Sequence, residues 1–387
     1  MNPETNDHAR VMRIIARMNV GGPAVQVSGL MRGLNTMRFE HRLYTGFCGD
    51  DEADYLESVA TDVHAFRVKG LGRHISLTGD ISAFLNLVKE IRKFKPHIIH
   101  THTAKAGFLG RTASMVSFHR SIRIHTFHGH LLNGYFGSFK RILVVVTEKL
   151  LALCTDQLLA VGEKVRQDLL DEGIGAKEKF GLMPPGLEIS NLPNKNCSKL
   201  QLGVSPDRLQ CAFIGRVTKI KRPDRFLDVV AEVKRRNLDV EFFMAGEGEL
   251  SEYCRERVHS ERLPVKLLGW QTDIERVLSA ADIVLLTSDN EGTPLSLIQA
   301  GMSGLPVVTT NVGSVPEVVL DEVTGLVVQP NVQDLANALE KLILDNSLRM
   351  QFGAAAQKFT LANFGVNRLV KDHETLYERL LTSRAKS

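Results

Sequence analysis

The stretch TSDNEGTPLSLIQAGMS, residues 287–303, follows a short apolar run at residues 282–286. An apolar run of this length, followed by a turn and a helical pattern, predicts a buried strand of a parallel sheet and then a helix with Pro294 in its first turn. The amino end of such a helix faces the ligand side of the sheet and presents free amides, so it favours an anion. The residues that carry or flank these amides are Gly292, Thr293, Pro294, Leu295 and Ser296.

Two polar side chains accompany this predicted anion site. Glu291 lies in the turn before the helix, and Gln299 follows eight residues later, about two helical turns further on. This spacing places the carboxylate and the amide near one face of the helix. Taken alone, Glu291 is more typical of an ordinary surface carboxylate at a turn between a strand and a helix.

Two cations follow another predicted strand, at residues 209–214. Gly215 and Arg216 come directly after this strand, and Lys221 lies five residues beyond the arginine. A guanidinium group offers a planar fork to phosphate oxygens, and an ammonium group acts as a point charge. The pattern therefore predicts a phosphate-binding loop at the end of the strand, with a solvated basic loop as the alternative.

These motifs resemble those of the retaining glycosyltransferases of family four, whose fold is called GT-B. The family pattern is a glutamate, seven residues and a second glutamate, whereas the second position here is Gln299. The resemblance implies that Glu291 faces the sugar of a nucleoside diphosphate sugar and that Gln299 holds the ribose. It also implies that Arg216 and Lys221 clamp the diphosphate, so that no metal ion is required. Because glutamine gives up a charge-assisted hydrogen bond, we expect it to weaken nucleotide binding.

Strand and helix patterns alternate along the chain, which predicts an α/β fold. In the resembled family this fold consists of two doubly wound Rossmann-like domains that face a central crevice. We expect an N-terminal acceptor-binding domain at residues 1–188 and a C-terminal nucleotide-sugar-binding domain at residues 189–364. By the same analogy, the final helix, residues 365–387, packs back on the first domain. The elements predicted for the first domain include strands at 11–16, 64–68, 98–100 and 122–126 and a helix at 81–94.

Glycine-rich turns and the single tryptophan complete the predicted donor site. Gly21 and Gly22 follow the first predicted strand, and Gly246 and Trp270 follow strands of the second domain. A glycine pair before a helix lets the backbone approach a ligand closely, although a simple tight turn explains it equally well. The resemblance places the first loop against the donor diphosphate and the acceptor, and Trp270 beside the nucleotide base. Packing of Trp270 at a domain edge is an equal alternative.

Five histidines follow or end predicted strands and are expected at the carboxyl edge of the first sheet. They are His100, His102, His125, His128 and His130. No carboxylate lies among them and their spacing fits no familiar metal site, which disfavours a metal centre. The resemblance assigns contact with the donor sugar and orientation of the acceptor to His128, with His130 as the reserve. A loop histidine with satisfied hydrogen bonds is the alternative.

Composition and charge limit the remaining possibilities. The 387 residues carry a net charge of +4 and no nucleic-acid-binding motif, so nucleic acid is not an expected partner. Five scattered cysteines without paired spacing favour free thiols in the cytoplasm. The sequence shows no signal peptide and no apolar run long enough to span a membrane.

The segment 67–149 is strongly basic, with fourteen Lys or Arg against three acidic residues. Such a field attracts anionic partners. The apolar loop 131–136, followed by Lys140, Arg141 and the apolar run 142–146, favours peripheral contact with an anionic membrane surface. A buried helix beside a solvated basic face explains the same pattern.

The sequence therefore favours a retaining hexosyltransferase that needs no cofactor and no metal ion. Its expected donor is a nucleoside diphosphate sugar, and its expected acceptor is a polyprenyl-linked saccharide of bacterial surface-polysaccharide synthesis. The expected location is the cytoplasm, at the inner face of the plasma membrane. Two other classes remain open: a nucleotide-sugar 2-epimerase with the same fold, and a catalytically silent binding protein, which the glutamine at position 299 would suit.

Overall fold

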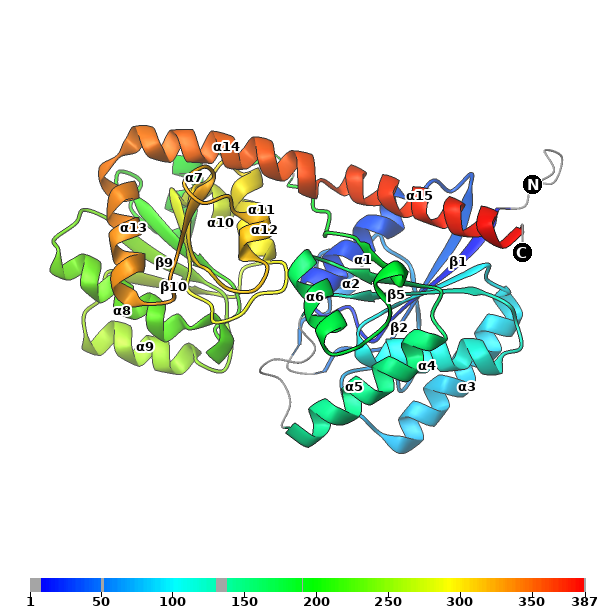
Figure 1. Cartoon of the computed structure of the whole chain (residues 1–387). Helices are drawn as coiled ribbons and strands as arrows, with labels where there is room; N and C mark the ends of the chain where they lie inside the picture. Colours follow the sequence, from blue (N-terminus) through cyan, green and yellow to red (C-terminus); the bar gives the residue numbers. More distant parts are fainter. Residues whose placement is uncertain (1–7, 50–51, 130–137, 190, 386–387) are drawn as a thin grey trace. The chain divides into compact units, whose positions relative to one another are not determined.

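The computed structural model describes residues 8–49, 52–129, 138–189 and 191–385. The chain forms two compact units (Figure 1). The first unit contains residues 1–186 and 366–387, and the second unit contains residues 187–365. Each unit has its own parallel sheet and its own apolar core, so the predicted α/β class is confirmed.

The first unit is built on a seven-stranded parallel sheet with the order β3-β2-β1-β4-β5-β6-β7. The chain enters at the middle of this sheet and later strands extend it on both sides, as in doubly wound folds. The strands are β1 Ala9–Ile15, β2 Phe39–Thr45, β3 Ala65–Arg67, β4 Ile98–His102, β5 Ile122–Phe127, β6 Gln157–Ala160 and β7 Phe180–Leu182.

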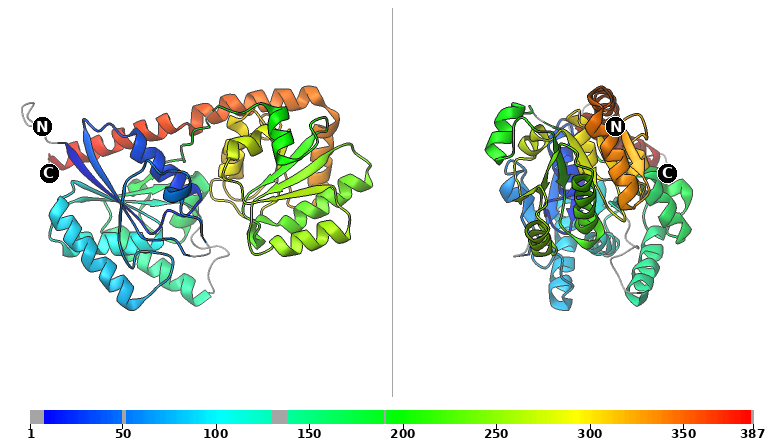
Figure 2. Two further views of the ribbon diagram at one scale, coloured as in Figure 1. Left: turned by 180° about the vertical axis from the view of Figure 1, so that it is seen from behind. Right: turned by 90° about the vertical axis from the view of Figure 1, so that its left-hand side faces the viewer.

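Helices cover both faces of this sheet (Figures 1 and 2). Met12 and Ile14 of β1 pack on the face covered by α3 and α4, whereas Val11, whose side chain points the other way, packs with α1 and α15. The last helix of the chain is therefore part of the core of the first unit. The helices are α1 Gly22–Gly33, α2 Tyr55–Ser58, α3 Leu77–Phe94, α4 Ala104–Val116, α5 Ser138–Leu153, α6 Glu163–Asp171 and α15 Val366–Ala385.

The second unit contains a six-stranded parallel sheet with the order β10-β9-β8-β11-β12-β13. Its core includes the edge-to-face rings of Phe213, Phe226 and Phe242. The strands are β8 Gln210–Ile214, β9 Glu241–Ala245, β10 Val265–Gly269, β11 Ile283–Leu286, β12 Val307–Thr310 and β13 Gly325–Val328. The helices are α7 Lys195–Leu202, α8 Pro223–Arg235, α9 Ser251–Ser260, α10 Ile274–Ala280, α11 Leu295–Met302, α12 Val315–Val318, α13 Val332–Leu344 and α14 Asn346–Phe364.

Some elements differ from their prediction. β2 was not identified from the sequence, because polar residues at 40–42 interrupt its apolar pattern. β7 has only three residues, too few to form a recognisable pattern. α3 begins at Leu77, four residues before the predicted start, because the hydroxyl of Ser76 caps it by accepting a hydrogen bond from the Gly79 amide at 3.4 Å.

Candidate functional site

Two loops meet at the carboxyl edge of the second sheet, because β8 and β11 are neighbouring parallel strands. The loop after β8 includes the short 3-10 helix Lys219–Lys221, and the loop after β11 leads to α11. The amide of Asp289 donates a hydrogen bond to the carbonyl oxygen of Ile220 at 2.9 Å. The hydroxyl of Thr287 donates a hydrogen bond to the carbonyl oxygen of Arg222, also at 2.9 Å. These bonds fix the two predicted donor-binding segments against each other.

Lys221 and Glu291, predicted separately as site residues, form a direct ion pair. The Lys221 ammonium group donates to Glu291 Oε1 at 2.5 Å, and the Ser288 hydroxyl donates to the same oxygen at 2.6 Å. Glu291 is only 8% exposed, so it is not the surface carboxylate of the alternative interpretation. The pair places one positively and one negatively charged group at the amino end of α11.

The backbone of Glu291 is held as firmly as its side chain. Its carbonyl oxygen accepts a hydrogen bond from the Ser314 amide at 3.0 Å. Gly313 has φ +53°, and a β-carbon at this position would lie 1.9 Å from the same carbonyl oxygen. Only glycine tolerates both conditions, so the loop after β12 can close against Glu291.

A second network of charges supports the same loop. Asp289 accepts hydrogen bonds from Arg225 at 2.7 Å and from Arg222 at 3.0 Å, and Arg225 also donates to the carbonyl oxygen of Thr287 at 2.8 Å. Asp224 binds the other side of the Arg222 guanidinium group. The sequence analysis missed these residues. Two arginines at the start of α8 are visible in the sequence, but no nearby residue indicates that they pair with an aspartate in the loop after β11.

The amino end of α11 has the predicted free amides. The helix begins at Leu295, so Pro294 precedes it as the capping residue and does not lie in its first turn. The amides of Leu297 and Ile298 donate to the Pro294 carbonyl oxygen at 3.2 and 3.3 Å. Those of Leu295 and Ser296 donate to nothing in the part of the chain that the structure describes, which leaves two hydrogen-bond donors for an anion. Gly292 and Thr293 form the turn between Glu291 and this helix.

The loop after β8 also presents an arginine to solvent. Arg216 is exposed, and its guanidinium group forms no hydrogen bond or ion pair with any residue among those described. Gly215 before it and Gly246 after β9 lie against each other: a β-carbon on Gly246, whose φ is +142°, would lie 1.9 Å from the Gly215 carbonyl oxygen. Gly246 is therefore required by the packing of the two loops, whether or not it also meets a ligand.

Trp270 and Gln299 are not joined to the Lys221–Glu291 pair by any hydrogen bond. Trp270 follows β10 and is 44% exposed, so its ring is available to a partner. Gln299 is partly exposed on α11, and its side-chain amide forms no hydrogen bond with a described residue. Both side chains are free to bind a ligand, but the structure does not bring them into contact with the charged pair.

Two of the five predicted histidines, His100 and His125, do not lie at the edge of the first sheet. β4 extends to His102, so His100 lies inside the strand, and His125 lies inside β5. His100 and His125 are 0% and 1% exposed and bond to Thr126 and Thr101 at 2.7 and 2.8 Å. The expectation that these two face a ligand at the sheet edge is therefore wrong, and both belong to the core.

His102 and His128 do lie at the carboxyl edge, at the ends of two neighbouring strands. Nδ1 of His102 lies 2.9 Å from Nε2 of His128, so one ring donates a hydrogen bond to the other. Burial lowers the pKa of His128 to about 3 and holds the pKa of His102 well below its usual value. Both rings are therefore neutral at physiological pH. His130 lies outside the described residues.

A buried polar cluster lies behind these histidines, on the face covered by α15. Arg13 is fully buried in β1 and donates to the Tyr377 hydroxyl at 3.2 Å, while Tyr377 also lies 2.7 Å from Nδ1 of His100. His373 on the same helix stacks on His100. The sequence analysis missed Arg13, His373 and Tyr377, because an arginine within an apolar strand and a tyrosine near the chain end give no local signal of contact.

The glycine pair after β1 lies at the amino end of α1. Gly21 precedes the helix, and a β-carbon placed on it would meet only the Asn19 carbonyl oxygen, at 3.9 Å, among the described atoms. Gly22 is the first residue of α1. Crowding within the chain does not explain the glycine at position 21, but its φ of +159° is a conformation that other residues rarely adopt, so the tight-turn interpretation stays open beside a ligand contact.

Among the described residues, no three or more His, Cys, Asp or Glu side chains are grouped so that they could hold a metal ion. In the same part of the chain, no helix combines the length and apolar character that crossing a membrane requires.

Two family models match the chain, one in each half. The model "Glycosyltransferase Family 4" matches residues 20–191, and the model "Glycosyl transferases group 1" matches residues 198–359. The fold and these matches define a glycosyltransferase with the GT-B fold. The chain belongs to glycosyltransferase family four.

Similar proteins come from bacterial polysaccharide synthesis. UDP-Gal:alpha-D-GlcNAc-diphosphoundecaprenol alpha-1,3-galactosyltransferase of Escherichia coli is 28% identical over 345 residues, which cover 86% of this chain and 87% of that protein. The capsular polysaccharide biosynthesis glycosyltransferase CapM of Staphylococcus aureus is 24% identical over 80% of this chain and 83% of its own. The crystal structure of HepE from Anabaena with UDP and glucose has a TM-score of 0.80 at 19% identity, covering 96% of this chain and 100% of that one.

Proposed function

We propose that this protein transfers a hexose from a UDP-sugar to a lipid-linked saccharide, with retention at the anomeric carbon and without a metal ion. The observation that carries the proposal is the Lys221–Glu291 pair at the open amino end of α11. The names of the similar proteins support the choice of ligands: HepE was crystallised with UDP, and the E. coli relative uses UDP-galactose and a diphosphoundecaprenol acceptor.

The donor diphosphate would be held by Arg216, Lys221 and the free amides of Leu295 and Ser296. Lys221 and the two amides are fixed in place by the two interlocked loops, so they can stabilise the negative charge that develops on the leaving nucleotide without rearranging. Arg216, whose side chain is exposed, would turn onto the diphosphate. Arg216, Lys221 and the amino end of α11 would supply the positive charge that a divalent metal ion supplies in metal-dependent transferases. Gln299 would bind the ribose, and Trp270 would stack on the base.

Glu291 would orient the donor sugar and would not attack it. Its Oε1 atom already accepts hydrogen bonds from Lys221 and Ser288, which lower its nucleophilicity. Retaining glycosidases use a carboxylate nucleophile about 5 Å from a carboxylic acid. Among the residues assigned to the donor site, Glu291 is the one carboxylate, so it has no such partner. We therefore favour departure of the diphosphate and arrival of the acceptor on the same face of the sugar. His128, held neutral and bonded to His102, would hydrogen-bond a sugar hydroxyl.

A membrane-borne acceptor fits the surface of the first unit. The outer faces of α3, α4 and α5 expose large apolar side chains where a protein surface is normally polar. They are Leu77, Ile81, Leu85, Phe108, Met115, Val116, Ile142, Leu143, Val146, Leu150 and Leu153. On α5 the exposed positions repeat every three or four residues and form a single stripe. The predicted apolar loop 131–136 lies outside the described residues, so these helices carry the proposal of peripheral membrane contact.

The transfer reaction is tested by measuring UDP release from UDP-galactose and other UDP-hexoses, with and without a polyprenyl-diphosphate-linked saccharide. A transferase releases UDP at a rate that depends on the acceptor and is unchanged by EDTA. An epimerase releases UDP and free sugar without any acceptor, and a silent binding protein releases nothing. Lys221→Ala should reduce the rate at least a hundredfold, because a stabiliser of the leaving group is lost. Lys341→Ala, an exposed lysine on α13, is the control, and a near-native rate for Lys221→Ala would refute the assignment.

Membrane contact is tested by flotation with anionic liposomes. Leu150→Glu places a charge in the apolar stripe of α5 and should release the protein from the vesicles. The matched control is Leu344→Glu, at a leucine of the second unit that is 70% exposed, against 62% for Leu150. Equal retention of the two variants would contradict a docking surface on α3, α4 and α5.

A further inference from the structure

Two histidines at the carboxyl edge of the first sheet share a hydrogen bond that can run in either direction. Nδ1 of His102, at the end of β4, lies 2.9 Å from Nε2 of His128, which follows β5. Both rings are neutral at physiological pH, so a single proton lies between these two nitrogens. Either His102 donates and His128 accepts, or the reverse. The direction also decides whether Nδ1 of His128 offers a donor or an acceptor to a ligand.

His102 is held in a fixed orientation. Its ring stacks on that of His100, with the centroids 4.4 Å apart, and both ring nitrogens of His100 have hydrogen-bond partners at 2.7 Å. The next residue, Thr103, has φ +68°, a backbone conformation that costs energy for a β-branched residue. Its hydroxyl accepts a hydrogen bond from the Ala16 amide at 3.3 Å, which helps to hold the end of β4 in this conformation. A ring held in this way can fix the state of its partner.

The second ring nitrogen of His102 differs between the two directions. His102 is fully buried, and its Nε2 atom has no hydrogen-bond partner in the described part of the chain. If His128 donated, Nε2 of His102 would carry a proton and would be a buried N–H group without an acceptor. If His102 donates, the same atom has only an unused lone pair. The surroundings of Nε2 therefore decide the direction.

Arg13 makes these surroundings positive. Arg13 is fully buried on the same face of the sheet, because it pairs in register with His100 while Ile15 pairs with His102. Nε and Nη2 of its guanidinium group are buried without a partner among the described residues, and a guanidinium group can only donate. Burial and the neighbouring histidine rings lower the pKa of His102, and the charge of Arg13 adds to this shift. A nearby cation and unused donors favour the lone pair at Nε2 over an N–H group.

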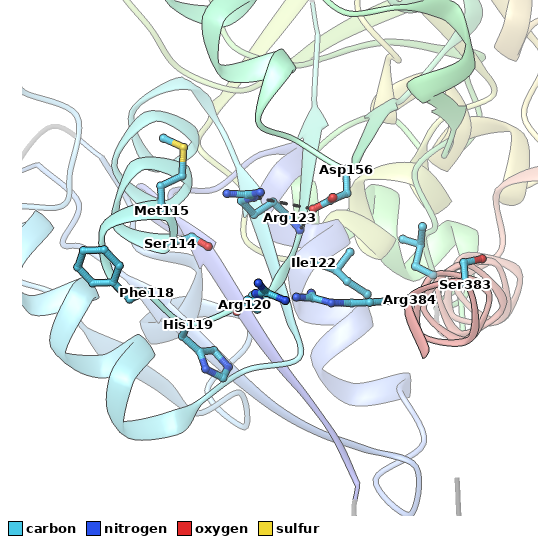
Figure 3. Close-up of a pocket in the computed structure, with 12 residues that line it drawn as sticks. Ser114, Met115, Phe118, His119, Arg120, Ile122, Arg123, Asp156, Ser383 and Arg384 are labelled. Atoms are coloured by element: carbon cyan, nitrogen blue, oxygen red, sulfur yellow. Dashed lines mark hydrogen bonds and ion pairs between the residues drawn. The ribbon is translucent and has the colours of Figure 1, made fainter. Parts of the chain in front are cut away.

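The amino ends of the neighbouring strands carry a pair of a different kind. Asp156, just before β6, accepts a hydrogen bond from the backbone amide of Arg123 at 2.7 Å, and its carboxylate lies 3.8 Å from Nε of that arginine (Figure 3). The negative charge of the aspartate fixes the direction of this interaction. No described carboxylate bonds His102 or His128, so the direction of their hydrogen bond depends on Arg13 and on burial.

We propose that His102 is a positioning residue, which donates a hydrogen bond from Nδ1 to Nε2 of His128 and so holds the proton of His128 on its own Nδ1. That Nδ1 atom bonds no described residue, and His128 is not fully buried. His128 then presents an N–H donor to an oxygen atom of the sugar and cannot act there as a general base. This inference rests on the proposed transfer reaction, in which His128 contacts the sugar.

The direction is tested by NMR on the full chain with ¹⁵N-labelled histidine rings. Long-range correlation of ring protons and nitrogens identifies which nitrogen of each neutral ring carries the proton. Coupling across the hydrogen bond identifies His102 and His128 in the wild-type spectrum, so this measurement needs no variant. The expected result is a proton on Nδ1 of both rings. A proton on Nε2 of His128 would overturn the proposal.

The positioning role is tested with His102→Leu, which removes the donor to His128. His128 should no longer be held in the single form with the proton on Nδ1, and kcat/KM for transfer from UDP-galactose should fall about tenfold, the effect of one hydrogen bond. The matched control is His373→Leu, at another fully buried histidine of the first unit, whose Nδ1 bonds the Leu369 carbonyl oxygen of its own helix. The control should change neither the spectrum of His128 nor the rate. Melting temperatures establish that both variants are folded.

Equal rates for His102→Leu and His373→Leu would overturn the positioning role. If the wild-type chain releases no UDP in response to an acceptor, the proposed transfer reaction fails instead. The spectra of the wild-type chain and of His102→Leu would then still decide whether His102 holds the proton of His128 on Nδ1, because they do not depend on turnover.

Discussion

The hydroxyl of Tyr377, on the last helix of the chain, lies 2.7 Å from Nδ1 of His100 in the middle of β4. The same hydroxyl accepts a hydrogen bond from the buried guanidinium group of Arg13 at 3.2 Å. All three residues are fully buried. One hydroxyl thus satisfies two polar groups of the sheet, so the end of the chain is needed to complete the core of the first unit.

Removal of this hydroxyl should destabilise the first unit. Tyr377→Phe keeps the packing of the ring but removes the hydroxyl that bonds Arg13 Nη1 and Nδ1 of His100, which leaves these two atoms only their 3.4 Å contact with each other. The loss should cost about 1–3 kcal/mol in the free energy of unfolding. Urea unfolding followed by circular dichroism measures this loss. Tyr253→Phe, on the exposed α9, is the control and should change stability by less than about 0.5 kcal/mol. Equal stability of the two variants would mean that water replaces the hydroxyl.

Acid should unfold the first unit before the second. Four of its histidines, His100, His102, His125 and His373, are buried, and burial lowers the pKa of each. Below about pH 6.5 the unfolded chain takes up protons that the folded unit does not, so stability is complete above that pH and falls as the pH decreases. Each of these histidines removes about 1.4 kcal/mol per pH unit while the folded form stays neutral.

The second unit provides an internal control for this prediction. It contains a single histidine, His259, which is exposed, and it also contains the only tryptophan of the chain. Hydrogen exchange at decreasing pH should therefore show opening of the first unit while the fluorescence of Trp270 is still native. Replacement of His373 by Leu should reduce the pH dependence of the first unit. Simultaneous unfolding of both units at every pH would contradict the role of the buried histidines.

Asp289 should position the donor loop without touching the donor. Asp289→Asn weakens the bonds to Arg222 and Arg225, which releases the loop that carries Glu291. A displacement of about 1 Å in a catalytic group can lower the rate up to a hundredfold, so we expect kcat/KM to fall about ten- to a hundredfold. Asp239→Asn, at an exposed ion pair with Arg208, is the control. A positioning role predicts partial rescue by Asp289→Glu, which a merely destabilised fold would not show.

Gln299 offers a gain-of-affinity test of the donor site. Gln299→Glu restores the family carboxylate, and a charge-assisted bond to the ribose is about 1 kcal/mol stronger than a neutral one. The Kd for UDP, measured by calorimetry, should decrease about fivefold. Gln329→Glu, on an exposed residue after β13, controls for the added negative charge. Weaker UDP binding by Gln299→Glu would show that position 299 does not face the ribose.

The sequence predicted the architecture because apolar periodicity is a local signal, and the class of both sheets follows from it. Lys221 and Glu291 were each predicted from a local motif, but their ion pair was not, since it forms between loops 70 residues apart. His100 was misplaced for a related reason. β4 ends in Thr101 and His102, polar residues that do not continue an apolar pattern, so the strand seemed to stop at His100. Contacts made by α15 depend on tertiary packing, which no local pattern encodes.

The charge count of the basic segment was also misleading in one respect. Arg111 was counted toward a field that attracts anions, yet it is fully buried and its guanidinium group is paired with Glu148. Nη2 of Arg111 donates to the two carboxylate oxygens of Glu148 at 2.9 and 2.7 Å, and Nε donates to the Gly107 carbonyl oxygen at 2.8 Å. This pair joins α4 to α5, the helices that carry much of the proposed membrane surface.

The Arg111–Glu148 pair should therefore control both the stability and the membrane binding of the first unit. Arg111→Met leaves a buried carboxylate unpaired and should cost about 3–5 kcal/mol in the free energy of unfolding. In the double variant Arg111→Met/Glu148→Leu neither charge remains, so most of this loss should be recovered. Urea unfolding measures both values. If α5 binds vesicles only when it is packed against α4, liposome flotation should fail for the single variant and return with the double variant. Loss of flotation in both variants, with stability restored in the double variant, would contradict a link between this pair and membrane binding.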